Sequence, residues 1–165
     1  AAVRNRGTIG GSLANNDPAA CYPAVALSTG ATIVTNSREI SADDFFQGMF
    51  DTALEEGEII ISVRFPVPTS SSYQKFVQPA SRFAMVGVFL SKFADETKVA
   101  VTGASEGGVF RWSEAEAALN ENFSADSINN LSVDQNDMIS DIHASKEYRA
   151  HLVKIMTQRA IKGAS

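Results

Sequence analysis

The stretch VRNRGTIGGSLANNDPAA, from Val3 to Ala20, is the most informative part of this 165-residue chain. It combines a cluster of glycines with two hydroxyl side chains, Thr8 and Ser12. Glycines adopt backbone conformations closed to other residues, and without Cβ atoms they let a ligand approach the main chain. Successive N–H groups turned inward at such a bend, or at the start of a following helix, favour anionic oxygens. The stretch therefore predicts a phosphate cradle that a diphosphate would fit.

The two common phosphate motifs are both absent from this stretch. No Gly-Lys-Ser/Thr follows the glycines, and their spacing is not GxGxxG. A plain Gly-rich turn is the alternative interpretation, because glycine clusters mostly mark turns. Arg4 and Arg6 precede the glycines, where they either add positive potential near the diphosphate or form ordinary surface salt bridges.

Composition places the chain among globular proteins. With 44% hydrophobic and 20% charged residues, one domain or two small ones can bury a working core. The net charge of −5 argues against a nucleic-acid partner, which requires a basic face. No apolar run approaches the roughly 20 residues of a transmembrane helix. We therefore expect no membrane insertion and a cytoplasmic location.

Residues for catalysis or metal binding are scarce. Cys21 is the one cysteine, so it forms no internal disulfide and by itself holds no metal or iron–sulfur cluster. His143 and His151 are spaced to lie on neighbouring turns of one helix, where surface or capping roles are favoured. No GxSxG, HExxH or CxxC occurs. The pattern predicts neither catalytic residues nor a metal site, and favours a domain whose chemistry belongs to a bound cofactor.

Three segments carry a family resemblance. RNRGTIGGSLANNDPAA, residues 4–20, resembles the second FAD-binding motif of the flavoprotein (medium) subunit of molybdenum hydroxylases, the family of carbon monoxide dehydrogenase and xanthine dehydrogenase. KFVQPASRFAMVGV at 75–88 and DIHASKEYRAHL at 141–152 resemble later segments of the same subunit, in the same order. Three ordered matches are far more specific than one loop.

The resemblance implies an α+β fold in two parts. Residues 1–68 correspond to the second subdomain of a two-subdomain FAD-binding domain of the PCMH type. Residues 69–165 correspond to a small domain like the C-terminal domain of the carbon monoxide dehydrogenase flavoprotein, with helices packed on an antiparallel sheet. The family places another FAD subdomain ahead of these segments, so we expect a fragment that is inactive alone.

The resemblance also assigns cofactor-binding positions. Asp17 corresponds to the polar wall near the ribityl or ribose, Lys75 to a cation near the isoalloxazine, and Phe83 to an aromatic that packs on the ring. A solvated strand-edge lysine and a core phenylalanine are the alternatives for the last two. The positions assigned to the FAD pyrophosphate are Thr8, Ile9, Gly10, Gly11 and Ser12.

One position departs from the family pattern. The residue three after Pro18 is often acidic in these proteins and is Cys21 here. A lost carboxylate would weaken one flavin contact. We interpret Cys21 as a small buried hydrophobe without a redox role.

The implied function is electron transfer within a molybdenum hydroxylase, an oxidoreductase. A large partner subunit oxidises the substrate at molybdopterin, a small subunit passes electrons through two [2Fe–2S] clusters, and FAD delivers them to an external acceptor. Two alternatives remain open. One is a non-catalytic assembly module that lacks flavin, and the other is a flavoprotein of the wider FAD-linked oxidase group.

Periodicity and turn residues predict the elements. Two capping boxes, Ser41 with Asp44 and Ser113 with Glu116, begin helices. Gly107-Gly108 is predicted as a hairpin turn, and the boundary between the two parts is placed at 66–72, where the serine run Ser70–Ser72 ends a strand. The predicted strands cover 31–35, 58–65, 73–77, 83–93 and 98–104, in an antiparallel meander beyond the boundary. The predicted helices cover 18–27, 42–54, 113–119, 125–131 and 145–162.

Two of these helices have assigned faces. The aromatic-rich face of helix 42–54 is interpreted as core. The last helix has an apolar side and a basic side. The core residues of the first are Phe45, Phe46, Met49, Phe50 and Ala53. In the last helix the apolar side holds Tyr148, Leu152, Ile155, Met156 and Ile161, and the basic side Lys146, Arg149, Lys154 and Arg159.

Overall fold

The computed structural model describes residues 5–165. Its centre is a four-stranded antiparallel sheet in the order β6-β7-β8-β9. The strands are β6 (Ser70–Val77), β7 (Ala84–Lys92), β8 (Thr97–Ser105) and β9 (Gly108–Arg111). The predicted antiparallel meander is confirmed, and so is the hairpin turn at Gly107-Gly108.

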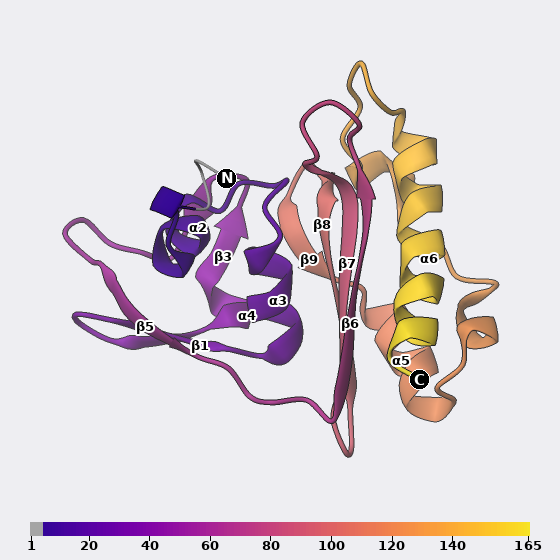
Figure 1. The fold of residues 1–165 in the computed structure, drawn as a ribbon, viewed down its shortest axis with the longest axis horizontal. Helices are drawn as coiled ribbons and strands as arrows, with labels where there is room; N and C mark the ends of the chain where they lie inside the picture. The colour runs from indigo at the N-terminus through magenta and orange to yellow at the C-terminus, as the bar shows by residue number, and fades with distance from the viewer. Residues whose placement is uncertain (1–4) are drawn as a thin grey trace.

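Helices cover both faces of this sheet (Figure 1). On one face lie α5 (Ser113–Glu121) and α6 (Lys146–Gly163), with short 3-10 turns at Ala125–Ile128 and Gln135–Asp137 between them. On the other face lies α3 (Tyr22–Thr29). Because β7 and β8 are covered on both sides, their side chains are buried almost without alternation, as expected of a central strand.

The first half of the chain forms a smaller layer beside α3. A three-stranded antiparallel sheet has the order β2-β1-β5. Leu13, Leu27, Ile33 and Phe45 form its fully buried core, which also includes Ala100 of β8, so the two halves share apolar contact. The elements are α2 (Ile9–Asn15), β1 (Thr32–Thr35), β2 (Glu39–Ser41), α4 (Ala42–Phe45), β3 (Phe46–Gly48), β4 (Asp51–Thr52) and β5 (Ile60–Arg64).

The helix predicted at 42–54 is wrong beyond its first turn. Ser41 does cap it, since its Oγ accepts from Asp44 N at 3.2 Å, but α4 ends at Phe45 and the chain enters the β3–β4 hairpin. The buried Asn16 holds that hairpin, because its Nδ2 donates to Gly48 O at 2.7 Å and to Asp51 O at 2.9 Å. As a result Phe50 is exposed rather than in the core, and so is Met49.

Several other helix and strand ends differ from prediction. The helix expected from residue 18 begins only at Tyr22, because the carbonyls of Pro18 and Ala20 are bound by Thr102 of β8. The serine run Ser70–Ser72 begins β6 instead of ending a strand. The helix expected at 125–131 is a single 3-10 turn at Ala125–Ile128.

The two helices packed on the sheet also correct the sequence analysis. Ser113 caps nothing: the residue before it, Trp112, occupies the cap position of α5, and Glu116 instead accepts from Val99 N at 2.8 Å. The last helix, predicted from residue 145, is α6, whose N-cap is Ser145, and Leu152, Met156 and Ile161 are buried as predicted. Arg149, assigned to the basic side, is buried as well. Within residues 5–165 no helix has the length and apolar character needed to cross a bilayer.

Gly103 and Gly57 both have a positive φ angle, so substitutions at the two positions test the packing around β8. Gly103 has φ +82°, and a Cβ there would lie 2.5 Å from Ala84 O, whereas Gly57 has φ +80° with nothing within 4 Å. We expect Gly103→Ala to lower the free energy of unfolding by roughly 3 kcal/mol or more, and Gly57→Ala by about 1 kcal/mol. Urea unfolding followed by circular dichroism measures both; equal losses would contradict the packing at Gly103.

Candidate functional site

The Gly-rich segment forms the start of a helix rather than an open loop. Thr8 is the N-cap of α2, and its Oγ1 accepts from Gly11 N at 3.0 Å. Gly10 and Gly11 therefore have helical conformations, contrary to the expectation of special backbone angles. Glycine provides needed space at position 11, where a Cβ would lie 3.1 Å from Thr8 Oγ1; at Gly10 a Cβ would make an ordinary contact, 3.6 Å from the Ile60 Cβ.

This helix start is accessible to an anion. Thr8, Ile9 and Gly11 are exposed, and the first turn of α2 contains no acidic residue. The first N–H groups of a helix have no partner within it, and the helix dipole makes this end positive. Arg6 is also exposed, while Arg4 lies outside the described residues. Chemically, the segment is suited to binding anionic oxygens.

The segment after α2 is fixed to β8. Thr102 Oγ1 lies 2.8 Å from both the Pro18 and Ala20 carbonyl oxygens, so its proton is shared between them. Gly103 N donates to Pro18 O at 2.7 Å. The half-buried Asp17 orders the turn itself, since its Oδ1 accepts from Ala19 N at 2.8 Å. The sequence analysis did not identify Thr102, because a threonine in a strand carries no distinguishing pattern.

Lys75 is on β6, and its side chain lies close to Cys21, which follows this segment in the sequence. Its Nζ donates to Arg82 O at 3.1 Å and lies 3.6 Å from Cys21 Sγ. Lys75 and Cys21 are both half-buried, so Cys21 is not the fully buried hydrophobe that we expected. Tyr73 lies beside Cys21, and burial of its phenol, whose hydroxyl has no hydrogen-bond partner among residues 5–165, raises the pKa far above the ordinary value. A Cβ at Gly87 would lie 2.6 Å from the Tyr73 hydroxyl, so glycine is needed there.

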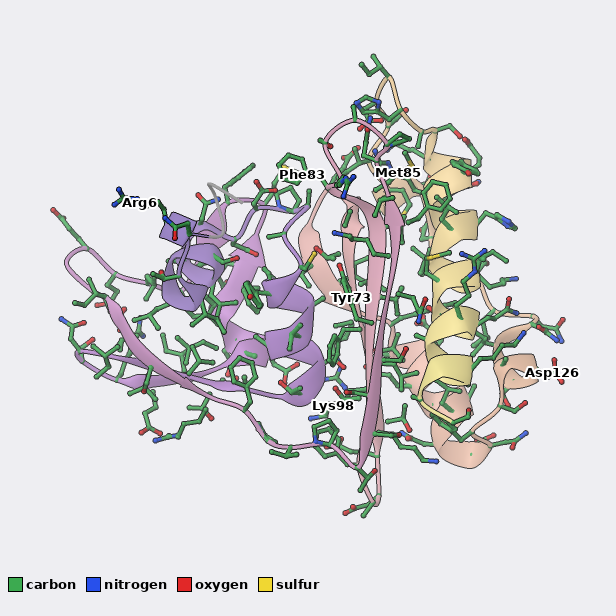
Figure 2. All side chains as sticks on the ribbon, in the orientation of Figure 1. Arg6, Tyr73, Phe83, Met85, Lys98 and Asp126 are labelled. Carbon is green, nitrogen blue, oxygen red and sulfur yellow. The ribbon has the colours of Figure 1, made fainter. Side chains whose placement is uncertain are left out.

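Phe83 is 62% exposed near the tip of the β6–β7 hairpin, which makes the core alternative wrong. Figure 2 shows Phe83 on the same edge of the molecule as Arg6, at the end away from Lys98. A cleft of about 250 Å³ lies beside it. Its lining includes Pro18, Ala19, Phe83, Asp141, His143 and Arg149. The three segments that carry the family resemblance therefore meet at one cleft.

Arg149 closes the inner side of this cleft. Its Nη1 donates to Met85 O at 2.7 Å and to Gly103 O at 2.8 Å, and its Nη2 donates to Asp141 Oδ2 at 2.6 Å. Burial acts to raise the pKa of Asp141, but hydrogen bonds from His143 N, Ala144 N and Arg149 outweigh it, so the pKa is lowered. Helical periodicity placed Arg149 on the basic side of the last helix. Its position in the sequence did not indicate that its guanidinium is buried at this cleft.

The histidines do not share a helix. His143 precedes α6, with its Nδ1 2.8 Å from Gln78 Nε2, while His151 is exposed on α6 itself. Among residues 5–165 no group of three His, Cys, Asp or Glu side chains is placed to hold a metal ion.

Comparison with known proteins agrees with this geometry. Residues 1–68 match the family model described as the FAD binding domain in molybdopterin dehydrogenase. The glyceraldehyde dehydrogenase medium chain of Sulfolobus acidocaldarius is 34% identical over 97% of this chain and 62% of its own length. The nicotine 6-hydroxylase medium subunit of Paenarthrobacter nicotinovorans is 34% identical over 96% of this chain and 61% of its own length.

Solved structures give the same result. A chain of the carbon monoxide dehydrogenase from Oligotropha carboxidovorans superposes with a TM-score of 0.85 at 26% identity, over 99% of this chain and 62% of that one. The fold and the helix start thus define an FAD-binding domain of the molybdopterin dehydrogenase type. Residues 1–68 thus belong to this FAD-binding domain family, and the chain as a whole is similar to medium subunits of molybdenum hydroxylases. It spans about three fifths of the length of the relatives it matches.

The buried arginine supports a stability prediction. Arg149→Met leaves Asp141 and two buried carbonyls without their partner, so we expect the free energy of unfolding to fall by roughly 3 kcal/mol, at the low end of the range for buried pairs because Asp141 is partly solvated. The matched control is Arg159→Met, at an exposed position of the same helix, which we expect to stay within about 0.5 kcal/mol. Urea unfolding at pH 7 measures both, and equal values would refute the role of Arg149.

The same pair gives a pH dependence. Because the pKa of Asp141 is lowered on folding, its stabilisation is fully present above its unfolded pKa of about 3.9 and is lost as the pH falls through the folded pKa. We expect Asp141→Asn to lose more stability at pH 7 than at pH 3, relative to the unsubstituted protein. Unfolding measured at both pH values tests this, and a loss independent of pH would contradict it.

Proposed function

We propose that this chain forms part of a flavoprotein that carries FAD and transfers electrons in a molybdenum hydroxylase. Electrons reach FAD from [2Fe–2S] clusters of a small partner subunit, after substrate oxidation at molybdopterin in a large partner subunit, and leave to an external acceptor. The observations that support this best are the meeting of residues 18–19, Phe83 and the 141–149 segment at one cleft, and the exposed start of α2 without an acidic residue in its first turn.

The diphosphate of FAD fits the start of α2. The exposed, positive start of α2 has no competing carboxylate and presents the N–H groups of Ile9 and Gly10 and the hydroxyls of Thr8 and Ser12, while Gly11 N and Ser12 N donate to the Thr8 hydroxyl and carbonyl oxygens. Glycine at position 11 keeps the Thr8 hydroxyl unobstructed. In this proposal Thr8 orders the helix start, and the following N–H groups hold the phosphate oxygens.

Lys75, Phe83 and Asp17 act on the rest of the cofactor. Bound FAD supplies the capacity to take up electrons singly and to release them as a pair. Phe83 offers an exposed aromatic face for the isoalloxazine. Lys75, held by Arg82 O, keeps a positive charge beside the ring. Asp17 orders the polar turn near the ribityl or ribose.

The two-part organisation belongs to the same proposal. Residues 1–68 form the second FAD subdomain and residues 69–165 the C-terminal-like domain, and the first FAD subdomain of the family, wherever it is encoded, completes the site. On this basis the chain alone lacks activity. The shared core around Ala100 supports the idea that the second domain braces the FAD subdomain.

A flavin titration tests the proposal. Quenching of FAD fluorescence is followed with the chain alone and with the first FAD subdomain supplied in trans. We expect binding only in the second case, and a Kd about tenfold weaker for Thr8→Val, equivalent to about 1.4 kcal/mol. The control, Thr32→Val on β1, leaves the Kd unchanged. No quenching under either condition would favour a flavin-free assembly module.

The charge of Lys75 gives a separate prediction for the flavin-loaded protein. A cation beside the ring stabilises its reduced, anionic form by Coulomb attraction. We expect Lys75→Met to lower the two-electron midpoint potential by on the order of 30 mV, or about 1.4 kcal/mol. Lys98→Met, at the far end of the sheet (Figure 2), is the control. Redox titration measures both, and equal potentials would remove Lys75 from the flavin site.

A further inference from the structure

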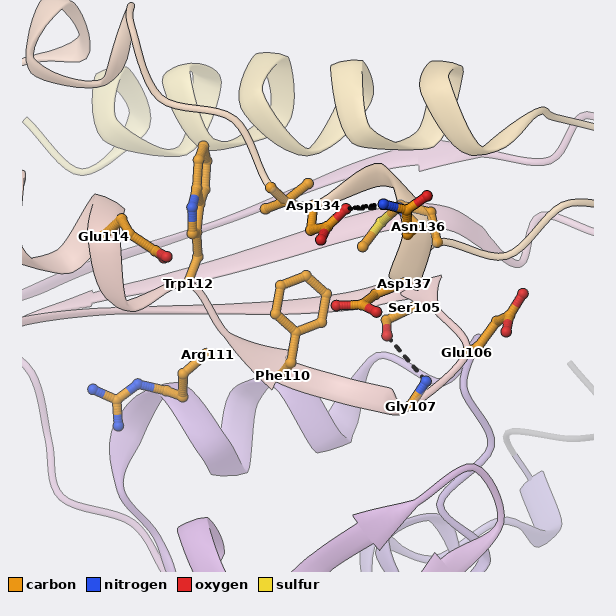
Figure 3. A pocket seen from close by; sticks show the side chains of 12 residues that line it. Ser105, Glu106, Gly107, Phe110, Arg111, Trp112, Glu114, Asp134, Asn136 and Asp137 are labelled. Atoms are coloured by element: carbon orange, nitrogen blue, oxygen red, sulfur yellow. Dashed lines mark hydrogen bonds between the residues drawn. The ribbon is translucent and has the colours of Figure 1, made fainter.

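A second cleft lies away from the one beside Phe83 and shares no lining residue with it. It has a volume of about 430 Å³ and opens between the β8–β9 hairpin, the start of α5 and the segment 133–138 (Figure 3). Among its lining residues are Phe110, Trp112, Glu114, Asp134 and Asp137. We refer to it as the Trp112 cleft.

The Trp112 cleft carries uncompensated negative charge. Nearby cations are already engaged: Lys146 Nζ pairs with Glu106 at 3.2 Å, and Arg111 pairs with Glu116 and with Asp43. Figure 3 shows the guanidinium of Arg111 directed away from the centre of the cleft. No ion pair within residues 5–165 involves the three remaining carboxylates, which are Glu114, Asp134 and Asp137. The cleft therefore favours a cation.

That cation is larger than a metal ion. The acidic side chains here form no group placed to hold a metal within the described part of the chain. The partly exposed ring of Phe110 adds aromatic surface to the same walls. A planar guanidinium stacks on aromatic rings and offers several donors to carboxylates at once. The lining thus matches an arginine side chain better than a compact ammonium ion.

The buried indole of Trp112 points to a second element of the ligand. Trp112 is only 2% exposed, and its Nε1 has no hydrogen-bond partner among the described residues. Figure 3 shows the indole at the wall of the cleft, with its nitrogen on the side of Glu114. An indole N–H donates only, so its partner is an acceptor. Because the surrounding carboxylates repel an anion, a neutral carbonyl is the fitting acceptor.

We propose that the Trp112 cleft binds an arginine of an extended peptide segment from a partner polypeptide. The guanidinium lies among Glu114, Asp134 and Asp137, and a main-chain carbonyl of the segment accepts from Trp112 Nε1. The assignment goes beyond the flavin site, and it rests on the proposed function only in that the partner is a polypeptide that assembles with this chain.

The sole tryptophan of the chain is the reporter for this site. The purified chain is titrated with the peptide acetyl-Gly-Arg-Gly-amide, and the emission of Trp112 is followed with excitation selective for tryptophan. The matched probe replaces arginine with citrulline, which keeps the shape and removes the charge. We expect a saturable emission change with a millimolar Kd for the arginine peptide, and at least tenfold weaker binding of the citrulline peptide.

Two variants assign the binding to the cleft. We expect the double substitution Asp134→Asn and Asp137→Asn to weaken binding of the arginine peptide at least fivefold. The control Asp95→Asn, at the exposed turn between β7 and β8, leaves the Kd unchanged. Binding should also weaken as salt is raised. No emission change, equal binding of both peptides, or equal Kd values in all variants would each overturn the proposal. FAD binding is measured separately on the same variants. This measurement distinguishes failure of the Trp112 cleft proposal from failure of the proposed flavin function.

Discussion

The buried guanidinium of Arg149 is the contact on which the arrangement of the cleft beside Phe83 depends. It binds the carbonyls of Met85 and Gly103 on two neighbouring strands and the carboxylate of Asp141 in the loop before α6. Gly103 in turn donates to Pro18 O. One buried charge thus connects the last helix, the central sheet and the segment after α2; the bonds of its Nη1 and Nη2 offset the cost of burial, while its Nε has no partner among residues 5–165.

The two clefts differ in chemistry because different elements close them. Beside Phe83, the lining is largely apolar, and the charge of Arg149 is compensated by Asp141. At the Trp112 cleft, carboxylates outnumber the cations that reach them. One edge of the chain is therefore suited to an aromatic, anionic cofactor, and the other to a basic polypeptide. In the proposed assembly, two clefts without a shared lining residue leave the proposed flavin site free while a partner is bound.

The local sequence was sufficient to predict those elements that are determined by interactions between residues close together in the chain. β7, β8 and the last helix were predicted nearly to their ends, because long apolar runs and helical periodicity specify them locally, whereas β9 was not predicted and β6 begins three residues before the predicted strand. The helix predicted at 42–54 failed because Asn16, more than thirty residues away, binds the hairpin backbone. The glycines at 10 and 11 were assigned to a turn, although the cap from Thr8 makes them helical.

The sequence by itself determined the α+β class, the antiparallel meander, the family and the segments that form the candidate site. The motifs identify these features because each reflects a requirement of the local backbone. Such a requirement can be recognised without knowing what the segment packs against. Only the tertiary structure decided that these segments meet at one cleft, that Arg149 is buried, and that Trp112 lines a cleft together with Glu114, Asp134 and Asp137. Such pairings join residues far apart in the chain, and their energies depend on burial and distance, which no local pattern encodes.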